Sequence, residues 1–286
     1  MPRVAIYTLG CKLNYAESST IGRQFVDRGF QLVESGAPAD VCVINTCSVT
    51  SRADRECRQL IRRARRTSKD ALIVVTGCYA QLEPHEVASM DGVDVVLGTR
   101  EKFSMFDYIG DPEKQATPRV CVTEIGGVHE FGPANSGDTD GRTRAFLKVQ
   151  DGCDYSCTFC TIPLARGASR SLPPDACIVQ ARDLVAQGYK EIVLTGVNVG
   201  CYGKDLGSNL LALLRELVTV EGLERIRISS IEPNLLTAEI IEFVAAQEKM
   251  CKHFHIPLQS GIDEVLRNMR RRYTTAQYAD LVHRIR

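Results

Sequence analysis

Three cysteines lie close together near the middle of the chain, at Cys153, Cys157 and Cys160. They follow a C-x3-C-x2-C spacing, and the nearest other cysteines, Cys121 and Cys177, are well separated from them. Thiolates at this spacing suit a soft metal centre, and iron–sulfur clusters usually take four of them. Three thiolates would leave one iron of a cluster open to a small molecule. A zinc site would need a fourth ligand nearby, yet a structural metal site or buried free thiols also fit the spacing.

The aromatic residue Phe159 stands directly before the last of these cysteines. With it, the segment resembles the signature of the radical S-adenosylmethionine (SAM) superfamily. The resemblance implies that Cys153, Cys157 and Cys160 hold a [4Fe–4S] cluster whose open iron binds the amino and carboxylate groups of SAM. It also implies that an electron from the cluster cleaves SAM to a 5′-deoxyadenosyl radical.

Size and composition are those of an ordinary globular protein. The 286 residues suffice for one large domain or two ordinary ones, and hydrophobic residues make up 44% of them. No run of about 18 apolar residues and no signal-peptide core is present, so we expect no membrane span and a cytoplasmic location. In that compartment twelve cysteines favour metal binding or catalysis over disulfides.

Strand and helix patterns alternate through the first 110 residues, which predicts a Rossmann-like parallel α/β sheet. A helix is expected over residues 17–28, with Asn14 in an N-cap arrangement and Gly29 ending it. A second helix is expected to open with Ser51 and Asp54. The expected strands are residues 4–11, 40–47, 72–78 and 93–98.

Three of the expected strands end in a cysteine, at Cys11, Cys47 and Cys78. Ligands of open α/β sheets bind at the carboxyl ends of the strands, so these side chains are expected to converge. On chemistry alone, a shared metal site and three unrelated buried thiols fit equally well.

The segments Thr-Leu-Gly-Cys11-Lys-Leu-Asn, Asn-Thr-Cys47-Ser-Val-Thr and Thr-Gly-Cys78-Tyr-Ala-Gln resemble the N-terminal domain of radical SAM methylthiotransferases. The resemblance covers nearly the whole chain. It implies that these three cysteines hold a second, auxiliary [4Fe–4S] cluster with an open iron that carries the transferred sulfur. The remaining cysteines are interpreted as small hydrophobic residues: Cys42, Cys57, Cys121, Cys177, Cys201 and Cys251.

A predicted helix over residues 52–68 is rich in arginine. The arginines are Arg52, Arg55, Arg58, Arg62, Arg63, Arg65 and Arg66. Helical periodicity places most of them opposite an apolar side formed by Cys57, Leu60, Ile61 and Ala64. The helix has few carboxylates, and the chain as a whole has a formal net charge of zero. A solvated face is the commoner explanation of a charge run, but this local excess favours a polyanion. The residues expected to contact RNA are Arg55, Arg58, Arg62 and Arg66.

Residues 111–141 have the composition of a linker, interrupted by a short strand around residues 119–123. We therefore expect an N-terminal domain at 1–110, which carries the auxiliary cluster, and a radical SAM domain at 142–286. From residue 144 the pattern is again β/α and predicts a partial (β/α) barrel. The expected strands are 145–150, 191–195, 225–230 and 253–257, and the expected helices are 174–187, 209–220 and 237–246.

Polar residues at the ends of these barrel strands are candidates for binding SAM. Serine and glutamate side chains bond ribose hydroxyls, and asparagine or glutamine bonds an adenine edge. The resemblance likewise implies SAM contacts at these positions. His255 fits a core histidine equally well, and Arg166 and Arg170 either bind SAM or phosphate or lie on the surface. The candidates for cofactor binding are Gly196, Asn198, Ser229, Glu232, His255, Gln259, Arg170 and, beside the cluster, Phe159.

The barrel pattern shows about four strands, whereas family members have six and a small C-terminal RNA-binding β-domain. We therefore expect the chain to lack these parts. The motifs around Cys11 and Cys78 and the arginine helix resemble most the bacterial branch acting on N6-threonylcarbamoyladenosine (t6A) in tRNA.

That resemblance implies methylthiolation of adenine C2 beside the anticodon, giving ms2t6A. It implies two [4Fe–4S] clusters, one SAM as methyl donor and another as radical source. The implied partners are tRNA and an electron donor such as flavodoxin or ferredoxin. The alternatives are methylthiolation of N6-isopentenyladenosine in tRNA, methylthiolation of a ribosomal protein aspartate, or a non-catalytic metal-binding RNA module.

Overall fold

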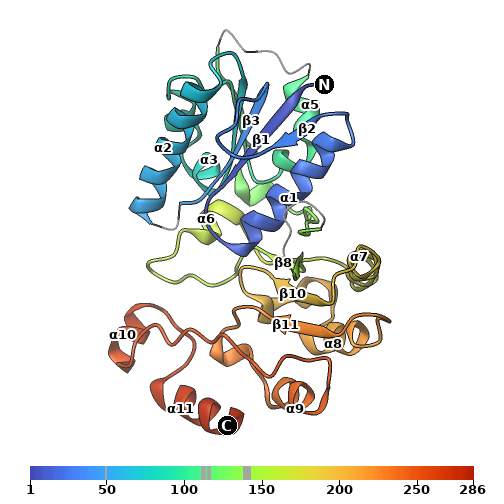
Figure 1. Ribbon diagram of the computed structural model, residues 1–286. Helices are drawn as coiled ribbons and strands as arrows, with labels where there is room; N and C mark the ends of the chain where they lie inside the picture. Colours follow the sequence, from blue (N-terminus) through green and yellow to red (C-terminus); the bar gives the residue numbers. More distant parts are fainter. Residues whose placement is uncertain (49, 111–113, 115–116, 138–142) are drawn as a thin grey trace. The chain divides into compact units, whose positions relative to one another are not determined.

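The computed structural model of the chain describes residues 1–48, 50–110, 114, 117–137 and 143–286 (Figure 1). Its internal contacts divide the chain into two units. The first is Met1–Thr139 with Leu164–Gly167, and the second is Asp140–Pro163 with Ala168–Arg286. Much of the expected linker, including the boundary expected near Gly141, lies outside the described residues.

The first unit is built on a six-stranded parallel sheet in the order β2-β1-β3-β4-β5-β6. The two central strands, β3 and β4, are buried along their whole length, as expected of a parallel sheet covered on both faces. The Rossmann-like sheet is therefore confirmed, with β2 as a strand that the sequence pattern did not predict. The strands are β1 Arg3–Thr8, β2 Gln31–Val33, β3 Val41–Thr46, β4 Leu72–Gly77, β5 Val95–Leu97 and β6 Arg119–Cys121.

Helices pack on both faces of this sheet (Figure 1). Alternate residues of β3 point to opposite faces, so Ile44 packs with Ile61 of α2 while Val43 packs with Phe25 of α1. Apolar side chains thus cover both faces of this central strand. The helices of this unit are α1 Lys12–Val26, α2 Ser51–Thr67, α3 Cys78–Leu82, α4 Pro84–Ala88 and α5 Met105–Ile109. Helix α6, Ile162–Arg166, places its last residues in the same unit.

The start of α1 was predicted wrongly. The helix begins at Lys12 and not at residue 17, with Cys11 as its N-cap. Asn14 lies inside the first turn, and its amide donates to the carbonyls of Leu9 at 2.7 Å and Thr46 at 2.8 Å. The amide therefore ties the helix to the ends of two strands instead of capping it. The predicted role of Gly29 is confirmed: its φ is +81°, and its N–H bonds the carbonyl of Val26.

The start of α2 also differs from the prediction in its capping. Thr50 is the N-cap, and its hydroxyl accepts from the N–H of Ala53 at 3.1 Å. Asp54 accepts instead from the hydroxyl of Ser48 at 2.7 Å. The helix itself lies where the sequence placed it, because its apolar stripe, not its cap, fixes its position on the sheet.

The second unit contains a three-stranded parallel sheet in the order β11-β10-β7, a partial barrel. Its strands are β7 Ala145–Lys148, β10 Glu191–Thr195 and β11 Arg225–Ile228, and a short antiparallel pair joins β8 Gln150–Asp151 to β9 Arg170–Ser171. Its helices are α7 Pro174–Ala186, α8 Leu210–Leu217, α9 Ala238–Ala246, α10 Asp263–Asn268 and α11 Thr275–Ile285.

The strand expected at residues 253–257 is absent from this unit's described residues, 143–286. Isolated bridges alone join Met250 to Ile226 and His255 to Ser230. The N–H of His253 bonds the carbonyl of Cys251 at 2.7 Å, so a tight local turn competes with a continuous ladder there. In the described parts of both units, no helix combines the length and hydropathy that crossing a membrane would require.

Candidate functional site

Three cysteines lie at one edge of the first unit's sheet. Cys11 precedes α1 just after β1, Cys47 follows β3 directly, and Cys78 begins α3 directly after β4. Because β1, β3 and β4 are neighbours in the sheet and run parallel, their carboxyl ends meet at the same edge. Cys47 and Cys78 are buried, whereas Cys11 is exposed.

Two glycines let the backbone approach closely at this edge. Gly10 has a φ of +101°, and a Cβ placed on it would lie 2.9 Å from the sulfur of Cys47. Gly77 has a φ of +96°, and a Cβ there would lie 2.4 Å from the carbonyl oxygen of Thr46. Both positions therefore require glycine, since the left-handed backbone and the lack of space exclude a side chain. The glycines shape the edge on which the cysteines stand.

Burial raises the pKa of the Cys78 thiol, while the positive charges of Arg166 and Lys102 oppose that effect. Cys11 lies near enough to Cys78 to raise its pKa further, so two of the three cysteines interact electrostatically. Burial outweighs the two cations, so the pKa of Cys78 stays above its ordinary value. The cations reduce the cost of forming the Cys78 thiolate, which is the form that binds metals.

The cations belong to a buried ion cluster that the sequence did not predict. Glu17 and Lys102 are both completely buried, and their charged atoms lie 2.7 Å apart. Arg166 binds both carboxylate oxygens of Glu17, at 3.0 and 3.1 Å, and the amide oxygen of Asn14 at 2.6 Å. Arg166 is only 1% exposed, so the surface position considered for it is wrong and its guanidinium is already engaged.

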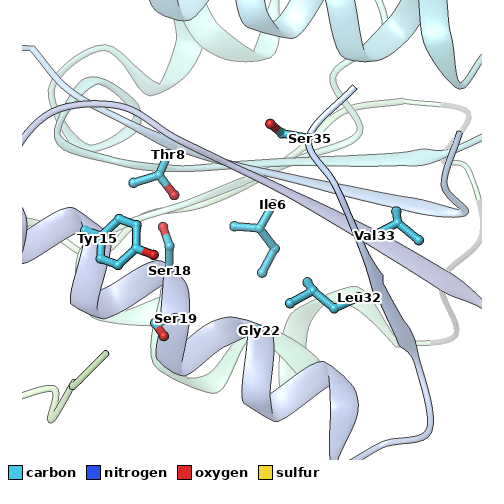
Figure 2. Close-up of a pocket in the computed structure, with 9 residues that line it drawn as sticks. All are labelled: Ile6, Thr8, Tyr15, Ser18, Ser19, Gly22, Leu32, Val33 and Ser35. Carbon is cyan, nitrogen blue, oxygen red and sulfur yellow. The ribbon is translucent and has the colours of Figure 1, made fainter. Parts of the chain in front are cut away.

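A separate hollow of about 320 Å³ lies between α1 and strands β1 and β2 (Figure 2). Thr8, Tyr15 and Ser18 gather at one end of it, and Leu32 and Val33 lie toward the other. The lining contains hydroxyls and aliphatic side chains but none of the cysteines. It offers no nucleophile, base or metal ligand of the kinds that the strand-end cysteines provide.

The second triplet lies in the loop between β8 and α6. Cys153, Cys157 and Cys160 are all partly exposed, and the N–H of Cys160 bonds the carbonyl of Cys157 at 3.1 Å. Burial raises the pKa of Cys153 to about 11, and the neighbouring thiols act in the same direction. Phe159, expected at the cofactor, is 51% exposed at the surface of this loop.

Arg271 is a neighbour of this triplet that sequence reasoning missed. Its Nη1 donates to the sulfur of Cys157 at 3.2 Å, and its Nη2 pairs with the carboxylate of Glu232. The side chain is only 4% exposed. Burial alone would lower the pKa of Arg271, but the hydrogen bond and charge of Glu232 raise it above its ordinary value. The guanidinium is therefore positively charged. Glu232, expected to bind SAM, is one of its partners.

Two strand-end candidates carry buried polar atoms with no partner. Asn198 is 3% exposed and Ser229 is 7% exposed. Within the part of the chain that the structure describes, Asn198 Oδ1 and Ser229 Oγ have no hydrogen-bond partner. Such atoms are destabilising unless something bonds them, so a polar ligand after β10 and β11 fits this edge.

The other candidates are placed differently. Gly196 packs closely, because a Cβ there would lie 2.8 Å from Gln150 Oε1. His255 is exposed and bonds Ser230 Oγ at 2.9 Å, which rules out the core histidine. Gln259 is exposed with a φ of +68°, a strained conformation for a residue other than glycine. Arg170 is buried, 3.7 Å from Asp151, which rules out the surface position that was the alternative to cofactor binding.

The donor chemistry of both triplets fits iron–sulfur clusters. Each supplies three thiols and no oxygen ligand, as soft metal centres prefer. Among the described residues, no group of three or more His, Cys, Asp or Glu side chains is arranged to hold a single metal ion. The thiolates of a cubane bind different irons, so they need not meet at one point. Of the other cysteines, Cys42, Cys57, Cys177 and Cys201 are completely buried, whereas Cys121 and Cys251 are partly exposed.

The arginine face of α2 is less uniform than expected. Cys57, Ile61 and Ala64 are completely buried, as the periodicity predicted. Arg58, however, donates to the hydroxyl of Tyr79 at 2.8 Å and pairs with Glu86 of α4 at 3.2 Å. Tertiary structure thus adds a carboxylate that the helix sequence lacks. The more open arginines of the expected set are Arg55, Arg62 and Arg66, which are exposed.

Beside α2 lies a surface hollow of about 680 Å³ lined mainly by arginines. Arg62, Arg63, Arg65 and Arg66 contribute to it, with Asp91 as its acidic member. The like charges of these arginines repel one another, and an anion bound in the hollow would offset that repulsion. The cationic face is therefore concentrated on the second half of the helix.

Comparison with known proteins identifies two family regions. Residues 3–98 match "Uncharacterized protein family UPF0004", and residues 147–286 match the radical SAM superfamily. A solved radical S-adenosylmethionine methyltransferase, TsrM from Kitasatospora setae, superposes with a TM-score of 0.63 at 16% identity. The superposition covers 99% of this chain and 66% of that one, and it shows likeness of fold.

Curated relatives carry methylthiotransferase names. The threonylcarbamoyladenosine tRNA methylthiotransferase MtaB of Bacillus subtilis (strain 168) is 46% identical over the whole chain, which spans 64% of that relative's length. MtaB of Aquifex aeolicus (strain VF5) is 39% identical, and the match covers 98% of this chain and 68% of the relative. A tRNA-2-methylthio-N(6)-dimethylallyladenosine synthase of Cereibacter sphaeroides (strain ATCC 17029 / ATH 2.4.9) is 35% identical over 99% of the chain and 65% of the relative. The chain therefore belongs to the radical SAM methylthiotransferase family.

Proposed function

We propose that the protein is a tRNA methylthiotransferase that acts on C2 of t6A beside the anticodon and forms ms2t6A. The observation that carries the proposal is the pair of cysteine triplets, one on three neighbouring strand ends and one in a single loop. Relatives named for threonylcarbamoyladenosine support the t6A substrate. Isopentenyladenosine is the alternative base, supported by the relative named for N(6)-dimethylallyladenosine.

The second unit binds and activates SAM in this proposal. Cys153, Cys157 and Cys160 hold one cluster, and Asn198 and Ser229 bond SAM through their buried oxygens. When bound, the cluster supplies an open iron for SAM and the electron that cleaves it. Gly196, His255 and Gln259 complete the strand-end surface. One SAM provides the methyl group and another the radical, and a protein such as flavodoxin or ferredoxin provides electrons.

The first unit presents the sulfur. Cys11, Cys47 and Cys78 hold the auxiliary cluster at the sheet edge, where Gly10 and Gly77 keep side chains away. Lys102 and Arg166 stabilise thiolate at Cys78 through their charges. These residues bind and orient, while the cofactors carry the chemistry.

The cationic half of α2 binds tRNA phosphates, consistent with an enzyme that works in the cytoplasm on tRNA. Reversing Arg55, Arg62 and Arg66 to Glu should weaken tRNA binding and flatten its dependence on salt. Each lost phosphate contact lowers the slope by about 0.7–0.9. Arg58→Glu is the control for the single reversal Arg62→Glu, because Arg58 is already paired with Glu86 and should change the slope less than Arg62 does. If all folded variants showed the same salt dependence of tRNA binding, the arginine face would be a solvated surface that does not bind tRNA.

The decisive experiment separates the two triplets. The whole protein is reconstituted anaerobically with iron and sulfide, and 5′-deoxyadenosine and modified nucleoside are measured together. Cys157→Ala should abolish both products and retain about four irons, one cubane's worth. Cys78→Ala should retain about four irons and SAM cleavage but form no methylthio base. Cys177→Ala, at a completely buried thiol, is the control and should preserve both activities.

Two results would refute this assignment. Zinc in place of iron would indicate a non-catalytic metal-binding RNA module. Methylthio product from Cys78→Ala would show that the strand-end triplet does not carry the sulfur. The substrate is tested by mass spectrometry of tRNA from cells lacking the protein, which should lose the methylthio group from t6A alone. Loss from isopentenyladenosine would assign the other base, and intact tRNA would point to the ribosomal aspartate.

A further inference from the structure

Arg271 is a buried cation whose place in the proposed reaction is not yet assigned. It is held in the second unit by Cys157 and Glu232, which precede it by 114 and 39 residues in the sequence. Its Nη1 lies 3.2 Å from the sulfur of Cys157, within the limit for a hydrogen bond to sulfur. The next residue, Arg272, is directed elsewhere, because its Nη2 donates to the carbonyl of Asp154 and its guanidinium lies over the ring of Tyr155.

The end of α10 delivers this side chain. Met269 is the C-cap, and Arg270 then adopts a left-handed conformation with a φ of +57°. The N–H of Arg270 bonds the carbonyl of Arg267, and the N–H of Arg271 bonds that of Leu266, both at 2.9 Å. This pair of bonds is the Schellman pattern, which reverses the chain direction at a helix end. It fixes the backbone of Arg271, and hence the base of its side chain.

Two further contacts immobilise the guanidinium. Glu232 pairs with Nη2, and the ring of Tyr273 lies 5.5 Å from the guanidinium carbon. Tyr273 is itself anchored, since its one hydroxyl proton is shared between the carbonyls of Leu258, at 2.7 Å, and Pro257, at 3.1 Å. These contacts restrain the side chain with an N–H directed at the Cys157 sulfur.

One donor of this buried group is still available. Arg271 Nε has no hydrogen-bond partner over the described residues, although the side chain is only 4% exposed. An unbonded donor on a buried cation is destabilising unless a negative group accepts from it. Arg271 can therefore donate to a second negative group in addition to the carboxylate of Glu232.

We infer that Arg271 is a positioning residue that holds Cys157 as a cluster ligand and favours the reduced state of that cluster. This inference rests on the proposed function, because it takes Cys157 to be a ligand. Reduction adds one negative charge to a cluster, and a cation bonded to a ligand sulfur stabilises the more negative state. Hydrogen bonds to cluster sulfurs and the surrounding charge are recognised determinants of reduction potential.

The test is a redox titration with dithionite as the one-electron source, followed by electron paramagnetic resonance without SAM. It is performed in a Cys78→Ala background of the whole protein, so that one cluster gives the signal. Arg271→Met removes both the charge and the donor. At a fixed solution potential it should lower the ratio of reduced to oxidised cluster about tenfold, which is about 59 mV for a one-electron couple. Arg271→Lys keeps the positive charge but lacks the two N–H groups that bond Cys157 and Glu232 together, so the ratio should fall by less.

Two further variants distinguish this role from a general structural one. Glu232→Gln removes the carboxylate that offsets the charge of Arg271, so the ratio should rise, opposite to the effect of Arg271→Met. Arg267→Met removes the same charge from an exposed position of α10 and should change nothing. If Arg271→Met fails to assemble a cluster, Arg271→Lys and Glu232→Gln still predict shifts of different sign.

The outcomes distinguish a failure of this inference from a failure of the proposed function on which it rests. A parent protein without an iron–sulfur signal would refute the proposed function. A parent signal with an unchanged ratio in Arg271→Met and Arg271→Lys would refute the inference alone. An unchanged ratio with weakened SAM binding would make Arg271 a SAM ligand and also overturn the role proposed here.

Discussion

Neutralising Glu17 is expected to be among the most destabilising conservative changes in the first unit. Its carboxylate is completely buried and is shared by Lys102 at 2.7 Å and Arg166 at 3.0 and 3.1 Å. Glu17→Gln keeps the size of the side chain but removes its charge. Both buried cations then lose this carboxylate, and desolvated charge without its counterion is strongly unfavourable.

The expected loss is about 3–5 kcal/mol in the free energy of unfolding, the usual result of removing one member of a buried ion pair. At roughly 2–4 °C per kcal/mol for a unit of this size, the melting temperature should fall by about 6–20 °C. Thermal and urea unfolding, read by circular dichroism under reducing anaerobic conditions, measure both quantities. Hydrogen exchange of α1 amides reports whether the loss is located where the ion cluster lies.

The control is Glu56→Gln on α2. Glu56 lies 2.9 Å from Arg52 at an i,i+4 spacing, but Arg52 is 87% exposed and Glu56 42% exposed. That substitution should lower stability by only about 0.3–0.5 kcal/mol. Replacing the cluster together, as Glu17→Leu with Lys102→Met and Arg166→Met, should recover much of the loss, because no buried charge is left behind. If Glu17→Gln is no more destabilising than Glu56→Gln, the reasoning from burial is wrong.

Three further substitutions test other features of the structure. Gly77→Ala should lower the free energy of unfolding by about 1–3 kcal/mol and reduce iron retention in the first unit, because its Cβ would lie 2.4 Å from the carbonyl oxygen of Thr46. Urea unfolding and iron analysis measure the two effects, and an unchanged stability would contradict the expected strain. Arg270→Gly should raise the free energy of unfolding by up to about 1 kcal/mol in urea unfolding. Glycine adopts the left-handed backbone without strain, and this gain exceeds the entropy that glycine adds to the unfolded chain. A loss of stability would show that contacts of the Arg270 side chain matter. Burial alone would raise the pKa of Glu191, but Arg227 and its neighbours hold it below its ordinary value. The contribution of Glu191 to stability is therefore full at neutral pH and is lost as the pH falls through this lowered pKa. Glu191→Gln should make the free energy of unfolding fall less steeply between about pH 7 and about pH 3. An unchanged slope would refute this linkage.

Elements with strong local patterns could be predicted from the sequence. Continuous apolar runs identified β3 and β4, and the apolar stripe of Cys57, Ile61 and Ala64 positioned α2 with its arginines outward. Strand topology also brought Cys11, Cys47 and Cys78 to one edge, although no spacing rule relates them. These features were predictable because strand and helix periods follow from neighbouring residues, and because strands that alternate with helices form a parallel sheet.

Helix starts and the strand at residues 253–257 were not predictable in the same way. The start of α1 depends on the close turn at Gly10 and on Asn14 bonding the ends of two strands, which the local sequence does not reveal. A capping pattern in the sequence competes with such long-range bonds, and here the long-range bonds prevailed. The turn at His253 likewise interrupted a pattern that favoured a strand.

The tertiary structure alone decided which charges are buried together. The sequence left Arg166 as a ligand-binding or surface residue and did not single out Arg271. Each side chain is almost completely buried against a carboxylate distant in the chain. Arg58 likewise finds Glu86 on another helix, which changes the arrangement of the arginine face. A charge run or a motif specifies residue types within a segment. The partner of a buried ion is fixed by which faces meet after folding, because only there does desolvation make the pairing decisive.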